Sequence, residues 1–495
     1  MSISRSSSLP NIAAELRRQH DAASPDPLAL PLLHSIASDR GSRLRGTGET
    51  LAHLDLAVPK GMRSQQASFS LPHEKPMVAG ESETQPWQLH DRHPVEAELT
   101  PLMYVNGKKP SMLTDDQWHG FLAAVATTFS DVARLHDAPK ADYIGALTRA
   151  PEDMTCSVVL HPVGQPPVSV DLGETSVSRT QQSYSKVVAY ALGDRGRRPA
   201  IDCAGSTTAT FQQAVTRGNA ADPVSRQLAM EVDVPEKLRE FERRLKTSSD
   251  PAVLGPLPTQ PLNSSYNIGA LQVVAEESGT NDTDPGGLRY RRRYDELLGR
   301  LADDGSGTCG PMRVDDEVMA SEYFDSPRNL LYALKAVRET HPELTDEEAL
   351  AAAHNVYRNY IHNCSIRMTA AQMATITATL SNGGVNPFTH EPVLSPETAA
   401  ATLAQMGASG MYESTAALRN EVPDYVMKSG VGGSVAAAGN GLSVVIWSTG
   451  LDQDGNSRLG KEFMRRLSRH PDHQAVLQAM RTAPAQVPDA SANSA

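Results

Sequence analysis

The sequence predicts an α+β fold in which antiparallel strands pack against helices. Three observations support this class: two Val-rich stretches about a Gly/Pro turn at 156–174, a block of helical periodicity in the C-terminal half, and strand-like runs between 425 and 449. A mixture of a hairpin, a helical block and late strands is typical of α+β layer folds.

The first elements can be justified in chain order. Residues 1–112 are rich in Ser, Pro and Gly and have no sustained apolar period, so we expect a largely disordered extension. The segment TDDQWHGFLAAVATTFSDVARLH (114–136) begins with capping-type residues and then carries apolar residues at helical spacing, which predicts an amphipathic helix. A β-hairpin follows at 156–174, and a helix is expected to begin near Gln182.

The rest of the chain divides into insertions and a mainly helical block. Residues 219–262 are charged and broken by proline, and residues 278–312 are rich in Gly, Asp and Arg, so both are predicted to be surface insertions. A helix in LGKEFMRRLSRH (459–470) is expected to close a domain that spans 113–472. Residues 473–495 are predicted to be a disordered tail.

Composition argues against several classes of protein. The net charge is −12 and no Lys/Arg run exceeds the RRR at 291–293, so we expect no nucleic-acid partner. No run approaches the ~18 apolar residues of a membrane helix, so no membrane association is expected. The four cysteines lack C-x-x-C spacing and no phosphate-binding glycine loop is visible, so neither a metal nor a cofactor is expected. A cytoplasmic protein is the first expectation, although the Ser-rich start would also suit a secreted effector acting in a host cell.

The segment QQSYSKVVAY (181–190) raises the question of a nucleophile and its base. Ser183 lies three positions before Lys186, and side chains at i and i+3 are neighbours on a helix, so the hydroxyl and the amine could meet. Taken alone, S-x-x-K is more often an ordinary first turn of a helix. The assignment therefore depends on the other motifs of the chain.

A series of short motifs runs through the chain in a fixed order. They are ADYIGAL (141–147), LGET (172–175) followed by QSYSK (182–186), QPLNSSYNIGAL (260–271), SEYFDSPRN (321–329), YIHNCSI (360–366), LSNGGVNP (380–387), GMYES (410–414), KSGVGG (428–433) and LDQDGNSRLG (451–460). Together they resemble the motifs of the serine-dependent glutaminases, over roughly residues 115–470. The resemblance implies a β-lactamase/transpeptidase-like fold, with an antiparallel sheet packed with helices and a helical subdomain.

The resemblance also implies roles for individual residues. Ser183 falls on the family's nucleophile and Lys186 on its partner, whose amine must be neutral to accept a proton. Tyr360 and Tyr412 fall beside the reacting amide, where either could pass protons to the leaving ammonia. The substrate-binding positions implied by the family are Tyr143, Ser183, Asn267, Glu322, Asn329, Tyr360, Tyr412 and Val431.

Within this set, the carboxylate of Glu322 would meet a substrate ammonium group, while Asn267, Asn329 and Tyr143 would donate to a carboxylate. The backbone N–H groups of Ser183 and Val431 would hold the oxyanion.

The implied activity is that of a glutaminase, hydrolysing L-glutamine to L-glutamate and ammonia through an acyl-serine. A homo-oligomer, dimer or tetramer, is implied as well. The sequence departs from the family where NPM has become NSS at Ser264 and Ser265, and where the two insertions lengthen the surface near the site. These departures leave two alternatives open: a deamidase acting on another amide or on a protein glutamine, and a catalytically weak glutaminase-like binding protein secreted as a bacterial effector.

Overall fold

The computed structural model describes residues 86–87, 102–142, 144–193, 264–278, 288–306, 312–325 and 328–482. All of them belong to one compact unit, Thr84–Ala495. Within these ranges, no helix is long and apolar enough to cross a membrane.

A seven-stranded sheet forms the centre of the described residues, with every pair of neighbours antiparallel, as the sequence predicts for an α+β fold. Its order is β1-β2-β4-β3-β10-β9-β8. The strands are β1 (Pro86–Trp87), β2 (Met103–Asn106), β3 (Thr155–Leu160), β4 (Val168–Leu172), β8 (Tyr425–Gly430), β9 (Ser434–Gly439) and β10 (Leu442–Trp447). The register pairs Val444 with Val158, so distant parts of the chain meet at the middle of the sheet.

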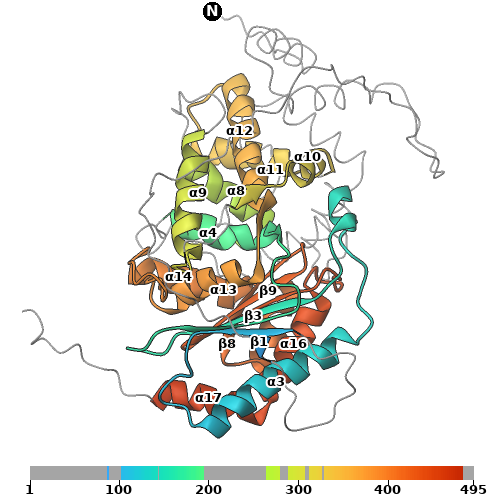
Figure 1. The fold of residues 1–495 in the computed structure, drawn as a ribbon. Helices are drawn as coiled ribbons and strands as arrows, with labels where there is room; N and C mark the ends of the chain where they lie inside the picture. The colour runs from blue at the N-terminus through green and yellow to red at the C-terminus, as the bar shows by residue number, and fades with distance from the viewer. Residues whose placement is uncertain are drawn as a thin grey trace, which may run out of the picture. The chain divides into compact units, whose positions relative to one another are not determined.

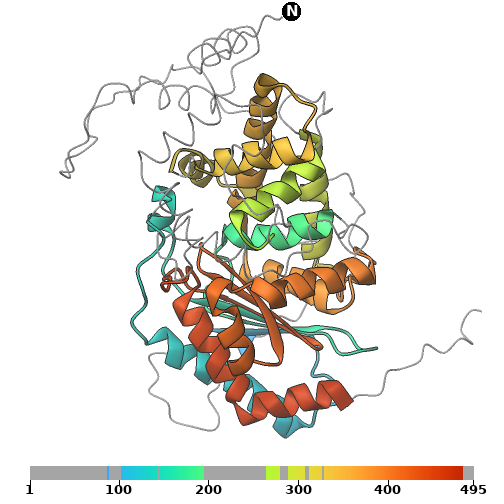
Figure 2. The same cartoon turned by 180° about the vertical axis from the view of Figure 1, so that it is seen from behind.

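Helices cover both faces of this sheet (Figures 1 and 2). One face carries α3 (Asp115–Ala133), α16 (Arg458–Arg469) and α17 (Pro471–Thr482), whose apolar side chains form one core with Cys156, Val158 and Leu160 of β3. The opposite face is covered by α13 (Ala370–Ser381), which packs on β3, β9 and β10. All six residues of β3 are buried. Because side chains alternate between the two faces of a strand, both faces of β3 are covered.

A helical layer stands beyond α13. It comprises α4 (Ser185–Leu192), α8 (Asn267–Ser278), α9 (Leu288–Ala302), α10 (Asp316–Asp325), α11 (Arg328–Thr340) and α12 (Asp346–Ser365). Helix α14 (Pro396–Ser409) lies beside α13 and packs on β8. A small sheet, β5-β7-β6, joins this layer to the large sheet through β5 (Arg179–Thr180), β7 (Ile366–Met368) and β6 (Arg313–Val314). The layer corresponds to the predicted helical subdomain.

Three predicted boundaries are wrong. Residues 103–106 were expected to be disordered, but they form β2, which pairs with β4; four residues are too short for a recognisable alternation. Residues 278–312 were predicted to be a surface insertion, but they include α9. The buried Tyr290, Tyr294 and Leu301 of this helix form an apolar stripe between many arginines and acids.

The third correction concerns the predicted tail at 473–495. α17 continues to Thr482, and its His473, Val476, Leu477 and Met480 are buried at helical spacing. Pro471 begins this helix at a position where a proline is tolerated. The insertion predicted at 219–262, and most of residues 1–112, lie outside the described residues.

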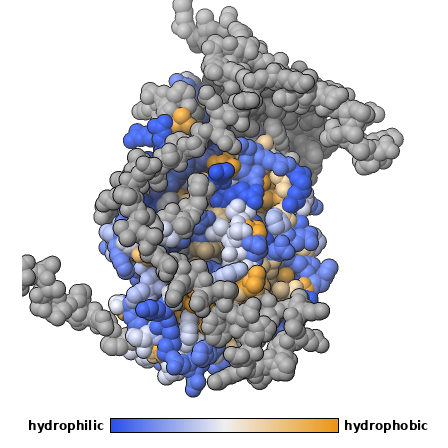
Figure 3. All heavy atoms as spheres, in the orientation of Figure 1, coloured by the Kyte–Doolittle hydropathy of each residue, from blue (hydrophilic) through white to orange (hydrophobic). Residues whose placement is uncertain are grey.

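The outer surface is mainly hydrophilic on the face drawn in Figure 3, where hydrophobic residues occur in small separate groups. Among the described residues, the large hydrophobic side chains that are exposed are Leu102, Val163 and Leu288. Scattered single residues of this kind are normal for a protein surface.

Candidate active site

Ser183 lies in a strained turn between a strand and a helix. The 3-10 turn η2 (Gln182–Tyr184) follows β5 and leads directly into α4. Gln182 has φ 47°, in the left-handed region, which costs a non-glycine residue roughly 1–3 kcal/mol and persists where the surroundings fix it. The side chain of Gln181 supplies such a fixture, since its Nε2 donates to Asn363 O at 2.7 Å and to Tyr294 OH at 3.2 Å.

The amine of Lys186 contacts the hydroxyl of Ser183. Lys186 Nζ donates to Ser183 Oγ at 2.5 Å and to Asn267 Oδ1 at 2.8 Å, and both Ser183 and Lys186 are buried. Burial lowers the pKa of Lys186 to about 8, although the nearby Cys364 and Glu322 side chains act in the opposite direction. A neutral amine is therefore accessible near pH 8, and a neutral amine can accept the proton of a hydroxyl.

Asn267 connects the lysine to two other predicted positions. Its Oδ1 also accepts a hydrogen bond from Tyr360 OH at 2.9 Å, and its Nδ2 donates to Asn329 Oδ1 at 3.3 Å. Tyr360 is buried, and Lys186 Nζ lies 5.8 Å from the centre of its ring. The structure thus brings together side chains from α4, α8, α11 and α12 that are far apart in the sequence.

Glu322, on α10, is a buried carboxylate with an unused acceptor. The residue is 3% exposed, and Oε2 has no hydrogen-bond partner among the described residues. Burial raises the pKa of Glu322 to about 8, against the attraction of Lys186. Because buried polar groups are nearly always paired, this oxygen can accept a hydrogen bond from a ligand.

Tyr412 is the second strained residue. It begins the 3-10 turn η5 (Tyr412–Ser414) with φ 51°. Its hydroxyl accepts a hydrogen bond from Lys428 Nζ at 3.3 Å, and the same amine lies 4.5 Å from the centre of the Tyr412 ring. Lys428 is almost fully buried and also donates to Ser429 O at 2.6 Å.

Lys428 is a residue that the sequence analysis missed. Burial lowers its pKa well below the usual value, and the positive charge of Lys186 adds to this effect. The available signal was its place at the start of KSGVGG, three positions before Val431. A single lysine in a predicted strand is, however, usually a solvent-exposed residue of an edge strand.

The turn that carries Val431 lies against the backbone of the Ser183 segment. A Cβ atom on Gly430 would stand 2.8 Å from Gln181 O, and one on Gly432 would stand 2.7 Å from Thr180 O. Only glycine permits these approaches, so the pattern G-V-G serves close packing here. Tyr143, the remaining predicted position, lies outside the described residues.

The motif LDQDGNSRLG holds η5 in place. Ser414 Oγ donates to Asp454 Oδ2 at 2.6 Å and accepts from Lys461 Nζ at 2.8 Å. Lys461 also pairs with Asp452, and Asn456 Nδ2 donates to Met411 O at 3.1 Å. These contacts anchor both sides of Tyr412 and explain why the motif stands so close to the site.

The strand order and the helices on both faces of the sheet give the chain the β-lactamase-like fold that was expected from the sequence. The solved structure of the probable glutaminase ybaS has this fold. It superposes with a TM-score of 0.51 at 22% identity, over 72% of this chain and 97% of that one.

Sequence relatives and a family model narrow the class. The glutaminase family model matches residues 253–475. A glutaminase from Cronobacter sakazakii is 35% identical over 42% of this chain and 62% of its own length. A glutaminase from Geobacillus kaustophilus is 29% identical over 66% of this chain and 90% of its own length. The chain is therefore similar to glutaminases in sequence and in fold.

The extent of these matches matters for the site. The chain spans 62% of the length of the Cronobacter relative that it matches. The family-model match includes Asn267, Glu322 and Tyr412, whereas Ser183 and Lys186 lie before its first residue. The family model therefore says nothing of the serine and the lysine, for which the sequence motif and the geometry are the evidence.

Proposed function

We propose that the protein is a glutaminase that hydrolyses L-glutamine to L-glutamate and ammonia, with Ser183 as nucleophile and Lys186 as its base. The observation that carries the proposal is the 2.5 Å contact between Lys186 Nζ and Ser183 Oγ inside a buried site. A serine hydroxyl is a weak nucleophile at neutral pH and needs such a base in contact with it.

In the first step, neutral Lys186 takes the proton of Ser183 as Oγ attacks the carbon of the side-chain amide. The carbonyl oxygen becomes an oxyanion, for which the backbone N–H groups of Ser183 and Val431 are the proposed donors. Two such preorganised donors contribute ~3 to 4 kcal/mol each to a transition state of this kind.

In the second step, the C–N bond breaks and the nitrogen takes a proton that originates on the Lys186 ammonium. Ammonia leaves and an acyl-serine ester is left. Tyr360 and Tyr412 are the proposed relays for this proton. Tyr360 OH and Lys186 Nζ both donate to Asn267 Oδ1, and Tyr412 OH accepts a hydrogen bond from Lys428. Water then attacks the ester, Lys186 again accepts a proton, and L-glutamate is released.

Recognition of free glutamine requires an anion for its ammonium and donors for its carboxylate. Glu322 is the proposed anion, because its Oε2 is buried and lacks a partner among the described residues. Asn267, Asn329 and Tyr143 are the proposed donors to the carboxylate. The amide Nδ2 of Asn267 now donates to Asn329 at 3.3 Å, a long bond that a carboxylate could displace.

The test is release of ammonia and glutamate from L-glutamine by the purified full chain, compared with Ser183→Ala, with asparagine as the control amide. The proposal expects turnover of glutamine that the variant lacks. A folded wild-type protein without activity on glutamine would overturn it and favour a deamidase of another amide, or of a protein glutamine, or a binding protein.

We further propose, from the family resemblance, that the protein forms a dimer or tetramer and acts in the cytoplasm. Light scattering of the purified chain measures the first. Fractionation of the producing cell tests the second against secretion as an effector.

A further inference from the structure

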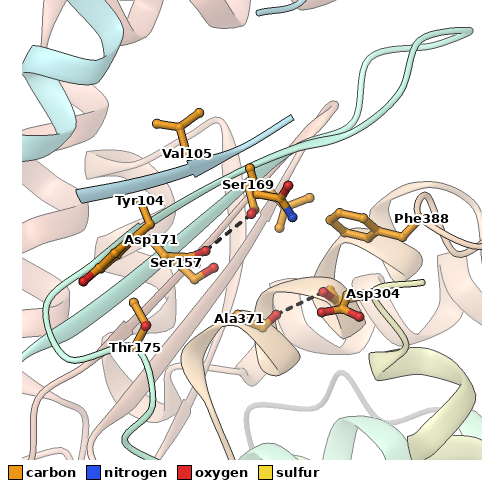
Figure 4. A pocket seen from close by; sticks show the side chains of 12 residues that line it. Tyr104, Val105, Ser157, Ser169, Asp171, Thr175, Asp304, Ala371 and Phe388 are labelled. Atoms are coloured by element: carbon orange, nitrogen blue, oxygen red, sulfur yellow. Dashed lines mark hydrogen bonds between the residues drawn. The ribbon is translucent and has the colours of Figure 1, made fainter. Parts of the chain in front are cut away.

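Two cavities of very different size contain buried polar side chains. One, of about 250 Å³, lies over β2, β4 and β3 at the edge of the large sheet (Figure 4). The hydroxyls of Ser157 and Ser169 donate to Asp171 there, so this carboxylate is paired within the protein. The other cavity has a volume of only about 10 Å³ and lies between α4, α14 and β8, beside the proposed active site.

The small cavity has a mainly polar lining. Lys186 of α4 and Lys428 of β8 line it, together with Gln405 of α14 and with Ser264 and Ser265, which precede α8. One water molecule needs a volume of about 10–15 Å³, and a buried water is retained where two to four polar groups bind it. The cavity therefore has the size and the polarity that suit a single water molecule.

The hydroxyl of Ser264 has no partner among the described residues. Ser264 is 2% exposed, and its Oγ is buried without a hydrogen bond. Its neighbour Ser265 differs, because Ser265 Oγ accepts a hydrogen bond from Gln405 Nε2 at 3.3 Å. Since buried hydroxyls are nearly always paired with the protein or with water, the cavity is where Ser264 would find its partner.

Both lysines have hydrogen-bonding capacity left. A lysine ammonium group has three donors. Lys186 Nζ donates to two side chains, at 2.5 and 2.8 Å, and Lys428 Nζ donates to Tyr412 OH at 3.3 Å and to Ser429 O at 2.6 Å. Each amine thus uses two of its three donors within the described residues, and one group between the two amines could accept a hydrogen bond from both.

We propose that the cavity holds one water molecule, which accepts hydrogen bonds from the amines of Lys186 and Lys428 and donates one to Ser264 Oγ. Three hydrogen bonds are the usual number for a buried water. Such a bridge solvates the ammonium form of Lys186 in a place where burial opposes that charge. The water therefore sets the pH at which the base becomes neutral, a consequence that rests on the proposed function.

Other titratable groups face Lys186 from outside the cavity. Glu322 of α10, and Tyr360 and Cys364 of α12, lie near its amine, and none of these three lines the cavity. Lys428 and Tyr190 line the cavity itself. A substitution at Ser264 leaves all of these side chains unchanged, so a change in the pH profile of such a variant reports on the water.

Two substitutions at Ser264 separate the effect of its hydroxyl from the effect of the space. Ser264→Ala removes the hydroxyl but leaves room for the water, which keeps its bonds to both amines. Ser264→Val also removes the hydroxyl, but its methyl groups occupy the space and displace the water. With the full chain, we expect the acidic limb of kcat/KM for L-glutamine to move to lower pH by about half a pH unit or more in Ser264→Val. The matched control Ser264→Ala should keep the limb of the wild type.

A crystal structure of the wild-type chain, at a resolution that shows ordered water, tests the site itself even if Ser264→Val does not fold. The expected result is a water within hydrogen-bond distance of Ser264 Oγ and of both amines. Absence of this water would overturn the proposal, and so would identical pH profiles of an active wild type and Ser264→Val. An inactive wild type that contains the water would contradict the proposed function and support the water site.

Discussion

Glu322 and Lys186 are buried near one another, and each stabilises the charged form of the other. Burial opposes both charges more strongly, so it raises the pKa of Glu322 to about 8 and lowers that of Lys186 to about 8. Below about pH 8, these pKa values favour a neutral Glu322 and a charged Lys186. The proposed chemistry needs the other form of each residue: an ionised Glu322 for the substrate ammonium and a neutral Lys186 for the serine proton. Both forms are produced as the pH rises.

The first prediction is therefore an acidic limb in the pH profile. We expect kcat/KM for L-glutamine to rise with pH towards a plateau above about pH 8, and to fall at least about tenfold per pH unit well below it. Initial rates between pH 6 and 10 measure it. A profile that is flat from pH 6 to 8 would contradict the assignment of Lys186 as the base.

The second prediction concerns Glu322→Gln. The change removes the anion that would meet the substrate ammonium, so KM should rise by about tenfold or more. It also removes a group that raises the pKa of Lys186, so the acidic limb of kcat should move to lower pH. Glu397→Gln, at an exposed position in the first turn of α14, is the control and should change neither quantity.

The third prediction tests the anchor of Tyr412. Ser414→Ala removes the hydroxyl that joins Asp454 and Lys461, so the strained turn should loosen and kcat should fall by about tenfold while KM changes little. Ser414→Thr keeps the hydroxyl and should restore most of kcat. If the threonine variant loses as much activity as the alanine variant, Ser414 has only a packing role.

The fourth prediction concerns α17, which the sequence analysis placed in a disordered tail. Leu477 is 1% exposed, so Leu477→Ala should lower the free energy of unfolding by about 2–5 kcal/mol. The exposed neighbour Gln478→Ala should change it by less than about 0.5 kcal/mol. Urea unfolding of the three proteins measures the difference; equal stability of both variants would show that α17 does not pack.

Local patterns in the sequence were sufficient for the elements with strong periodicity. α3 and the β3–β4 hairpin follow from apolar spacing, capping residues and a turn. α9 was missed because its arginines and acids hide an apolar stripe, and β2 because four residues hold little pattern.

For the proposed site, the i and i+3 spacing of Ser183 and Lys186 indicated their contact, since it lies within one helical turn. The contact of Lys186 with Asn267 joins residues 81 positions apart. The pairing of Asp171 with Ser157 and Tyr104 depends on three strands that meet only in the folded sheet. Both of these contacts join residues that are distant in the sequence, so the local spacing of apolar residues could not predict them.

The sheet order has a consequence for how this domain can be divided or inherited. The family-model match begins at residue 253, whereas β3, β4 and α3 all precede it in the chain. A polypeptide cut to residues 253–475 would leave β10 as a bare edge with six unpaired positions, and the face beneath it would lose α3. Such a fragment should aggregate when it is made alone. Gene fusions or duplications that preserve this fold must therefore carry both halves together, although the family model matches only one of them.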